Sequence, residues 1–92
     1  MHLVICYDVV QNKRRAKLHK RLKGFLRPVQ RSVFEGELPG HRHEALIRAI
    51  VDTIDHETDT VRVYHLCKAC AGLTELWGTS VELPDGEEDV VL

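Results

Sequence analysis

The sequence predicts an α+β fold of the ferredoxin-like type, a βαββαβ sandwich with both helices on one face of the sheet. Three observations carry this prediction. The 92 residues are enough for one small domain. An apolar run opens the chain, and stretches rich in β-branched residues alternate with two stretches of helical periodicity. The second face of such a sheet has no cover within one chain, so we expect a two-fold homodimer whose sheets stack.

The first two elements follow from residues 2–23. Residues 2–10, HLVICYDVV, are predicted as a buried strand because they are apolar and rich in valine and isoleucine. Residues 13–23 are predicted as a helix, with Asn12 as its N-cap and Gly24 as its stop. The face of this helix toward the core carries large apolar residues at helical spacing, namely Leu18, Leu22 and Phe25.

The remaining elements begin after Pro28, which we expect to break the chain. Residues 29–38 are predicted as a strand in which Gly36 marks a bulge or a tight turn, followed by a possible short strand. Residues 43–54 are predicted as the second helix, because leucine, isoleucine and valine recur at helical spacing. Residues 60–67 alternate in polarity and are predicted as a strand.

The C-terminal part is predicted to add strands to the sheet and to contact partner chains. Residues 73–78 are expected to form a further strand that completes a ferredoxin-like domain of residues 1–78. Residues 79–92 are expected to be a C-terminal extension, acidic with a short apolar end, that adds a strand to a sheet edge for dimer or partner docking. No stretch has the length of a membrane span and no signal peptide is recognisable, which predicts a cytoplasmic protein with no membrane partner.

Charge is distributed very unevenly along the chain. The net charge is −1, but residues 1–48 hold 11 basic and 4 acidic residues, whereas residues 49–92 hold 2 basic and 10 acidic residues. Such asymmetry favours a half that binds a polyanion. The alternative is that the two halves neutralise each other across one fold.

A cationic helix accounts for most of the basic half. Seven lysines and arginines fall between residues 13 and 23 with no acid among them. Their spacing suits successive phosphates, which predicts sequence-independent binding of nucleic acid. An ordinary solvated helix face is the alternative. The predicted contacts from this helix are Lys13, Arg14, Arg15, Lys17, Lys20 and Arg21.

Asp8 ends the first apolar run, directly after Tyr7. A carboxylate at the end of a buried strand is costly unless it is paired, hydrogen-bonded or bound to a metal. Aspartate suits Mg²⁺ or Mn²⁺, and two copies related by a two-fold axis would supply a weak site completed by water and phosphate. The alternative is that Asp8 caps the first helix or the turn before it.

Other chemical signals are weaker. Cys67 and Cys70 form C-x-x-C, and His65 could be a third ligand, but a zinc site usually needs a fourth. We therefore expect these cysteines to be structural or incidental, with an intersubunit metal or disulfide left open. Neither a nucleophile elbow nor a phosphate-cradling glycine loop is present.

Four stretches together resemble the small CRISPR-associated adaptation protein family, the second core CRISPR-associated protein and partner of the adaptation integrase. They are a strand ending in YD, then RRAKLHKRLKG, VQRSVFEG and DTVRVYHLC, and the resemblance runs over residues 1–78. The most specific of them is VQRSVFEG. The resemblance implies ferredoxin-like homodimers that act in spacer acquisition during antiviral defence.

The resemblance also implies a metal-dependent endonuclease acting on RNA or double-stranded DNA. Asp8 then matches the family's proposed Mg²⁺ ligand, with its mate from the other protomer, and Tyr7 precedes it as a second catalytic residue. Positions implicated in nucleic-acid contact or activity match Arg14, Arg15, Arg31 and Phe34. The alternative within the family is a non-catalytic scaffold that binds duplex DNA and bridges integrase dimers.

Two further classes compete with these. An RNA-binding module of ferredoxin-like fold would stack bases on sheet aromatics, but the chain has only five aromatic residues and lacks the required pattern. A small-molecule regulatory domain would not need a cationic helix.

Overall fold

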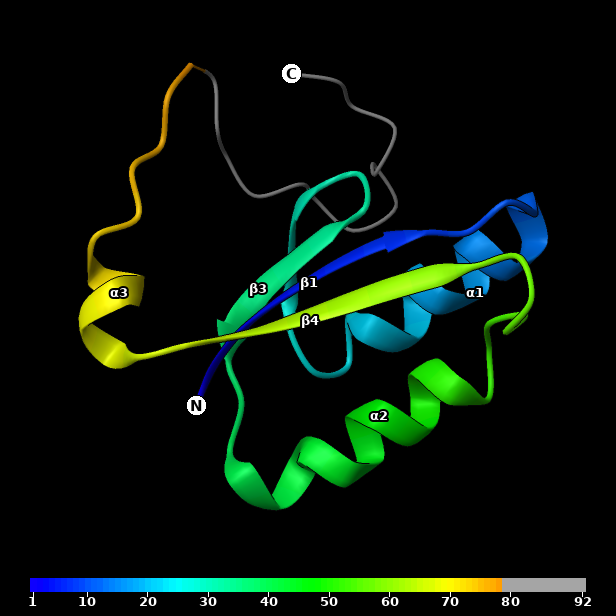
Figure 1. The fold of residues 1–92 in the computed structure, drawn as a ribbon, viewed down its shortest axis with the longest axis horizontal. Coiled ribbons are helices and arrows are strands. Elements are labelled where there is room, and N and C mark those ends of the chain that lie inside the picture. Colours follow the sequence, from blue (N-terminus) through cyan, green and yellow to red (C-terminus); the bar gives the residue numbers. More distant parts are fainter. Residues whose placement is uncertain (79–92) are drawn as a thin grey trace.

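The protein is built on an antiparallel sheet of order β2-β3-β1-β4 in a computed structural model that describes residues 1–78, and both main helices lie on one face of that sheet (Figure 1). β1 is central and pairs with β3 and β4. This topology confirms the predicted ferredoxin-like βαββαβ fold. In chain order the elements are β1 (His2–Asp8), α1 (Asn12–Leu22), β2 (Arg27–Gln30), β3 (Val33–Glu37), η1 (Gly40–Arg42), α2 (His43–Val51), β4 (Thr60–Leu66) and α3 (Lys68–Gly72).

Alternation along β1 decides which side chains enter the core. Leu3, Ile5 and Tyr7 are buried under the helices, whereas the side chains between them lie on the other face. The helices contribute buried leucines and an isoleucine to the same cluster, and Phe34 of β3 fills its centre. The buried apolar residues from α1 and α2 are Leu18, Leu22, Leu46 and Ile50.

The predicted strand over residues 29–38 is wrong in its bounds, because two strands occupy this region. The chain turns at Arg31 and Ser32, and the irregular register falls between Pro28 and Gln30 rather than at Gly36. Pro28 does not break the chain. It lies within β2, an edge strand, where a missing N–H donor is tolerated. Gly36 stays in β3 with φ of 156°, a conformation that side chains rarely adopt.

The helices are shifted slightly from their predicted ends. Gln11, not Asn12, is the N-cap of α1, and it makes no side-chain capping bond. The helix ends at Leu22, before Gly24. α2 ends at Val51, and just beyond it the Thr53 hydroxyl donates back to the Ala49 carbonyl at 2.7 Å.

The strand predicted over residues 73–78 is not formed. The chain instead makes the short helix α3, which starts where Cys67 caps it, and the residues after that helix have no strand beside them in the described part of the chain. An extended segment with no neighbouring strand gains no backbone hydrogen bonds between strands, so nothing stabilises residues 73–78 as a strand. The extension predicted for residues 79–92 lies outside the described residues.

One face of the sheet is left without helices. It carries the β1 side chains that alternate with the core, from His2 to Asp8, together with Arg62 and Tyr64 of β4. An uncovered face was the basis for predicting a homodimer. Separately, no helix within residues 1–78 has the length and apolar character needed to cross a membrane.

Candidate functional site

Asp8 is the last residue of β1 and lies opposite Thr60 of β4. Its side chain is exposed, and within residues 1–78 it makes no hydrogen bond or ion pair. It therefore does not cap α1 or the turn before it, which was the alternative role for this carboxylate. The carboxylate points to the sheet face that the helices leave open, because Tyr7 before it points into the core.

Tyr7 and Asp8 are consecutive, but their side chains lie on opposite faces of the sheet. Tyr7 is 6% exposed. Its hydroxyl donates to the Arg31 carbonyl at 3.2 Å and lies 3.4 Å from Nδ1 of His19. The predicted catalytic pair is thus not brought together within one chain, and the tyrosine hydroxyl is used to hold the fold.

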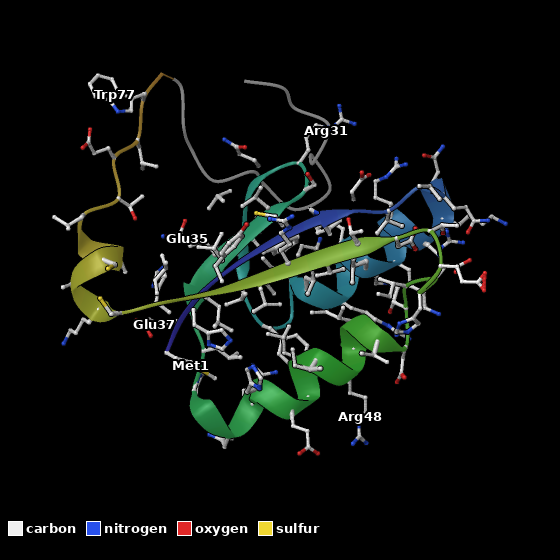
Figure 2. All side chains as sticks on the ribbon, in the orientation of Figure 1. Met1, Arg31, Glu35, Glu37, Arg48 and Trp77 are labelled. Atoms are coloured by element: carbon white, nitrogen blue, oxygen red, sulfur yellow. The ribbon has the colours of Figure 1, made fainter. Side chains whose placement is uncertain are left out.

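The β2–β3 turn is fastened beside the end of β1. The Tyr7 N–H donates to the Ser32 carbonyl at 3.1 Å, and the Tyr7 hydroxyl holds the Arg31 carbonyl. The Arg31 side chain is exposed and projects away from the sheet (Figure 2). Because the backbone of the β2–β3 turn is held in this way, Arg31 lies at the same end of the sheet as Asp8.

Phe34, the other predicted contact from this region, is fully buried. Its ring packs 5.0 Å from His19 and 6.3 Å from Tyr7, measured between centroids. Its side chain belongs to the core, so direct contact with a nucleic acid is not available to it in this structure. The signal for this was present in the sequence, since a strand alternates its side chains between faces and Glu35 beside it is charged.

The cations of α1 separate into two groups. Arg14 pairs with Asp59, with Nε 2.9 Å from Oδ2. Arg15 donates from Nε to the Val9 carbonyl at 3.1 Å, and Arg21 donates from Nη1 to the Thr53 hydroxyl at 2.7 Å. The three arginines thus fasten α1 to its surroundings.

Three lysines of α1 form the second group, here called the lysine stripe. They are exposed, make no hydrogen bond or ion pair within residues 1–78, and follow one another at i, i+4 and i+7 on one helix face. Among the six helix residues predicted to contact nucleic acid, these lysines are therefore the ones whose side chains have no partner within residues 1–78. The lysine stripe consists of Lys13, Lys17 and Lys20.

Asp59 organises the segment after Asp8, although it was not among the site residues predicted from the sequence. Its side chain is fully buried and accepts hydrogen bonds from the backbone N–H groups of Val10 at 3.1 Å and Asp55 at 2.8 Å. The hydrogen bond from Arg14 holds the pKa of Asp59 well below its ordinary value, and these backbone donors act in the same direction against burial. In the sequence, Asp59 differs from a nearby acid such as Asp52 only in standing directly before a strand, so little marked it as a residue with a special role.

The Arg14–Asp59 pair joins the basic and acidic halves of the chain across 45 positions. Part of the charge asymmetry is therefore neutralised inside the fold, as the alternative interpretation of that asymmetry proposed. The pair also fixes the backbone at Val10, two residues beyond Asp8. With Arg15 holding the Val9 carbonyl, the carboxylate of Asp8 stands on an anchored strand end.

The donor set at Asp8 fits a divalent cation only weakly within one chain. No group of three or more histidine, cysteine, aspartate or glutamate side chains within residues 1–78 could hold a metal ion. A single exposed carboxylate suits Mg²⁺, which keeps several waters and takes one or two carboxylates plus phosphate oxygens. A second chain is needed to bring a second carboxylate.

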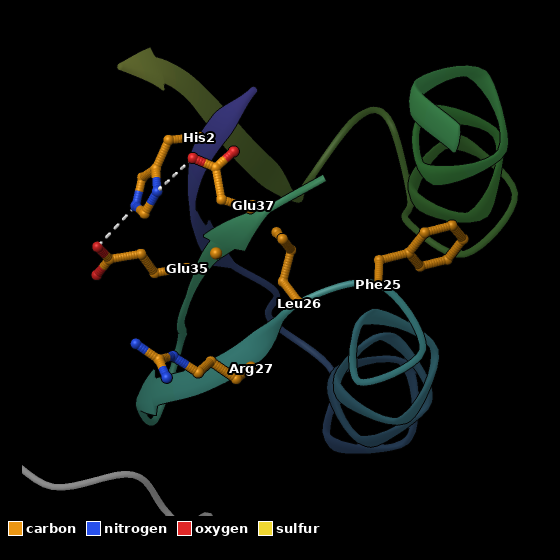
Figure 3. Close-up of a pocket in the computed structure, with 7 residues that line it drawn as sticks. His2, Phe25, Leu26, Arg27, Glu35 and Glu37 are labelled. Carbon is orange, nitrogen blue, oxygen red and sulfur yellow. Dashed lines mark hydrogen bonds and ion pairs between the residues drawn. The ribbon is translucent and has the colours of Figure 1, made fainter. Parts of the chain in front are cut away.

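A hollow of about 470 Å³ lies at the opposite end of β1 from Asp8, where His2 stands between two glutamates (Figure 3). Nε2 of His2 is 2.9 Å from Glu35 Oε2, and its Nδ1 is 3.6 Å from Glu37 Oε1. The N-terminal amine lies 3.4 Å from Glu37 as well. These acids are engaged locally, and none of the predicted site residues lines the hollow.

Comparison with known proteins covers nearly the whole chain. The family model described as CRISPR associated protein Cas2 matches residues 1–73. The CRISPR-associated endoribonuclease Cas2 2 of Methanospirillum hungatei is 42% identical over 93 residues, which span 99% of this chain and 99% of that protein. The CRISPR-associated endoribonuclease Cas2 of Frankia alni is 35% identical over 92 residues, which span 100% of this chain and 100% of that protein.

Solved structures agree with the sequence relatives. The crystal structure of Streptococcus pyogenes Cas2 at pH 6.5 superposes with a TM-score of 0.76 at 28% identity, covering 85% of this chain and 100% of that chain. The crystal structure of a hypothetical protein from Thermus thermophilus gives a TM-score of 0.77 at 30% identity, covering 88% of this chain and 95% of that chain.

Proposed function

Because the chain belongs to the CRISPR associated protein Cas2 family, we propose that it is a metal-dependent endonuclease of spacer acquisition that cuts RNA or double-stranded DNA. The names of the relatives describe an endoribonuclease. For this chain, the activity, its metal and the choice of substrate are part of the proposal, and so is its cytoplasmic location.

The observation that carries the proposal is the isolation of Asp8. Aspartate is disfavoured in strands, and this one makes no stabilising contact within the described chain. Yet the backbone around it is held from three sides, by the Ser32 carbonyl, by Arg15 and by Asp59. A rigid support for a side chain that the fold does not use is the arrangement expected of a functional group.

In the proposed homodimer, the open sheet faces stack, and the two copies of Asp8 would hold Mg²⁺, or Mn²⁺ in its place. A divalent cation bound there would neutralise charge on the phosphate and lower the pKa of a bound water. The chain's own contribution is to supply one carboxylate per protomer and to hold it still. Tyr7 acts as a positioning residue, because its hydroxyl fixes the turn that carries Arg31.

Exposed cations of α1 and of the β2–β3 turn would hold the nucleic acid by its phosphates. The lysine stripe and Arg31 have exposed ammonium and guanidinium groups available for contact. Arg14, Arg15 and Arg21 use donors within the fold, so their contribution is mainly the positive potential around α1. Such contacts recognise a phosphate backbone without reading its sequence.

Partner binding is proposed for the segment after β4. Leu73 and Leu76 are at least 73% exposed, which leaves large apolar side chains available for burial against another chain. We propose that this segment and residues 79–92 dock on the second protomer and on the CRISPR adaptation integrase.

A cleavage time course tests the nuclease proposal. Single-stranded RNA and a short DNA duplex are each incubated with the wild type in Mg²⁺, in Mn²⁺ and in EDTA, beside Asp8→Asn and the control Asp52→Asn. Asp52 is an exposed acid at the end of α2, in the helix layer. We expect cleavage that needs the metal and is lost only in Asp8→Asn; undiminished cleavage by that variant would remove Asp8 from the chemistry.

A second candidate function is the non-catalytic scaffold that binds duplex DNA and bridges integrase dimers. It is favoured by the sparse donor set, since Asp8 supplies one carboxylate at the strand end and no three-ligand group exists within residues 1–78. This function requires tight, salt-sensitive duplex binding without cleavage in any metal, and unchanged binding by Asp8→Asn.

A further inference from the structure

Two cysteines at the end of β4 stand in contact on the protein surface. Cys67 caps α3, and the backbone N–H of Cys70 donates to its Sγ at 3.2 Å. Both residues are exposed and both thiols are free. The pair was expected to be structural or incidental. The structure places both cysteines on one helical turn, with the backbone of Cys70 donating to the sulfur of Cys67.

We propose that Cys67 and Cys70 form a redox-active dithiol site, which low-molecular-weight disulfides oxidise to an intramolecular disulfide. The inference does not depend on the proposed nuclease function. Cysteines three positions apart at the start of a helix are close enough for this bond without movement of the sheet. Exposure of both sulfurs gives a small disulfide access to the first and leaves the second in place to resolve it.

The two sulfurs have different roles in this reaction. Cys67 is the nucleophile, because the hydrogen bond from the Cys70 thiol lowers the pKa of Cys67, and backbone N–H groups of Cys70 and Ala69 act in the same direction against desolvation. The same thiol contact raises the pKa of Cys70. Cys70 therefore stays protonated while Cys67 attacks, and it attacks second.

The steps balance as a thiol–disulfide exchange. The Cys67 thiolate attacks one sulfur of the small disulfide, forms a mixed disulfide and releases one thiolate. Cys70 then loses its proton to solvent and attacks the Cys67 sulfur, which releases the second small thiolate. Two protein thiols are oxidised by two electrons, and one small disulfide is reduced to two thiols.

The third cysteine provides an internal control. Cys6 lies on β1, partly buried on the open sheet face, and has no second cysteine on its strand. It pairs with Arg62 of β4, four positions before Leu66, so no cysteine of the same chain is near enough to form a disulfide with it. Oxidation at Cys67 and Cys70 would enclose only residues 67–70, so the entropic gain from closing that loop is small and the thermal stability of the core is expected to stay nearly unchanged.

The test uses the full chain equilibrated with mixtures of reduced and oxidised glutathione, then alkylated and counted by mass spectrometry. We expect the wild type, with three thiols, and Cys6→Ser, with two, each to lose the Cys67 and Cys70 thiols together without gain of glutathione at either position. Cys67→Ser and Cys70→Ser should instead gain glutathione, and Cys70→Ser should react the faster of the two. The proposal is overturned if all three thiols oxidise independently, or if disulfides form only between chains. It is also overturned if, in a glutathione mixture that already glutathionylates Cys70→Ser, the wild type keeps three alkylatable thiols.

Discussion

Replacing Tyr7 by phenylalanine removes one buried hydroxyl and leaves the ring in place. The hydroxyl donates to the Arg31 carbonyl at 3.2 Å and lies 3.4 Å from His19, a distance too long for a strong bond. The ring keeps its packing against Phe34, 6.3 Å between centroids. The variant therefore deletes a hydrogen bond that ties the β2–β3 turn to β1 and creates almost no cavity.

The expected cost to stability is about 1 kcal/mol. A neutral hydrogen bond contributes about 0.5–1.5 kcal/mol, and the Arg31 carbonyl is near enough to the surface to accept from water once the hydroxyl is gone. For a domain of this size, about 1 kcal/mol lowers the melting temperature by about 4–8 °C. Even a protein of about 5 kcal/mol stability would then remain more than about 99% folded at 25 °C.

Urea unfolding and cleavage rate, measured on the same preparation, separate the two roles of Tyr7. A positioning role predicts this modest decrease in stability with cleavage changed by less than about threefold, well below the effect of a proton-transferring group. A hydroxyl that transfers a proton in the reaction contributes about 10²–10⁴-fold. A decrease in cleavage on that scale in a folded Tyr7→Phe protein would refute the positioning role; Tyr64→Phe, which removes an exposed hydroxyl from β4, is the matched control.

Asp59, the lysine stripe and Gly36 each give a further prediction. Because the pKa of Asp59 is lowered in the folded state, the free energy of unfolding should fall as the pH drops below about 4, toward the pKa of the folded carboxyl. Urea melts should show that Asp59→Asn is less stable than the wild type at neutral pH and that its stability depends less on pH in acid. Glutamine in place of each lysine of the lysine stripe should make the plot of log K against log salt shallower by about 0.9 for every phosphate that the protein no longer neutralises, as measured by fluorescence anisotropy; an unchanged slope would place the nucleic acid elsewhere. Gly36→Ala should lower stability by about 1–3 kcal/mol in thermal melts, because φ of 156° is strained for alanine and its Cβ would stand 3.4 Å from Leu26; a melting temperature equal to that of the wild type would contradict this.

The fold was predictable because its strongest local patterns agree with its topology. The apolar run of β1 and the spacing of Leu18 and Leu22 each indicate a buried element, and the order of elements then leaves few arrangements. The turn at Arg31 and Ser32 was not predictable in the same way. Arg31 is not a typical turn residue and Ser32 is a weak one, so the sequence carries little turn signal there and the predicted strand runs through it.

The candidate site was predictable in its carboxylate and less so in its cations. Asp8 stands out because an acid ends an apolar run. The periodicity of α1 shows which residues face outward, but it does not show that Arg14 and Arg21 face the loop and helix end beyond residue 50. Asp59 could not be found for the same reason, since its partners are brought to it by packing and not by sequence proximity. The sequence also did not show that Tyr7 enters the core while Asp8 does not, because a continuous apolar run conceals which face each residue takes.

The measurement that tests the central claim most directly is the stoichiometry of Mn²⁺ binding to the purified protein, read by titration calorimetry or by the decrease of the free-ion paramagnetic signal. A cation shared by Asp8 and its copy predicts one Mn²⁺ for every two chains in the wild type and in Asp52→Asn, and none in Asp8→Asn. One cation per chain, or unchanged binding by Asp8→Asn, would contradict the account.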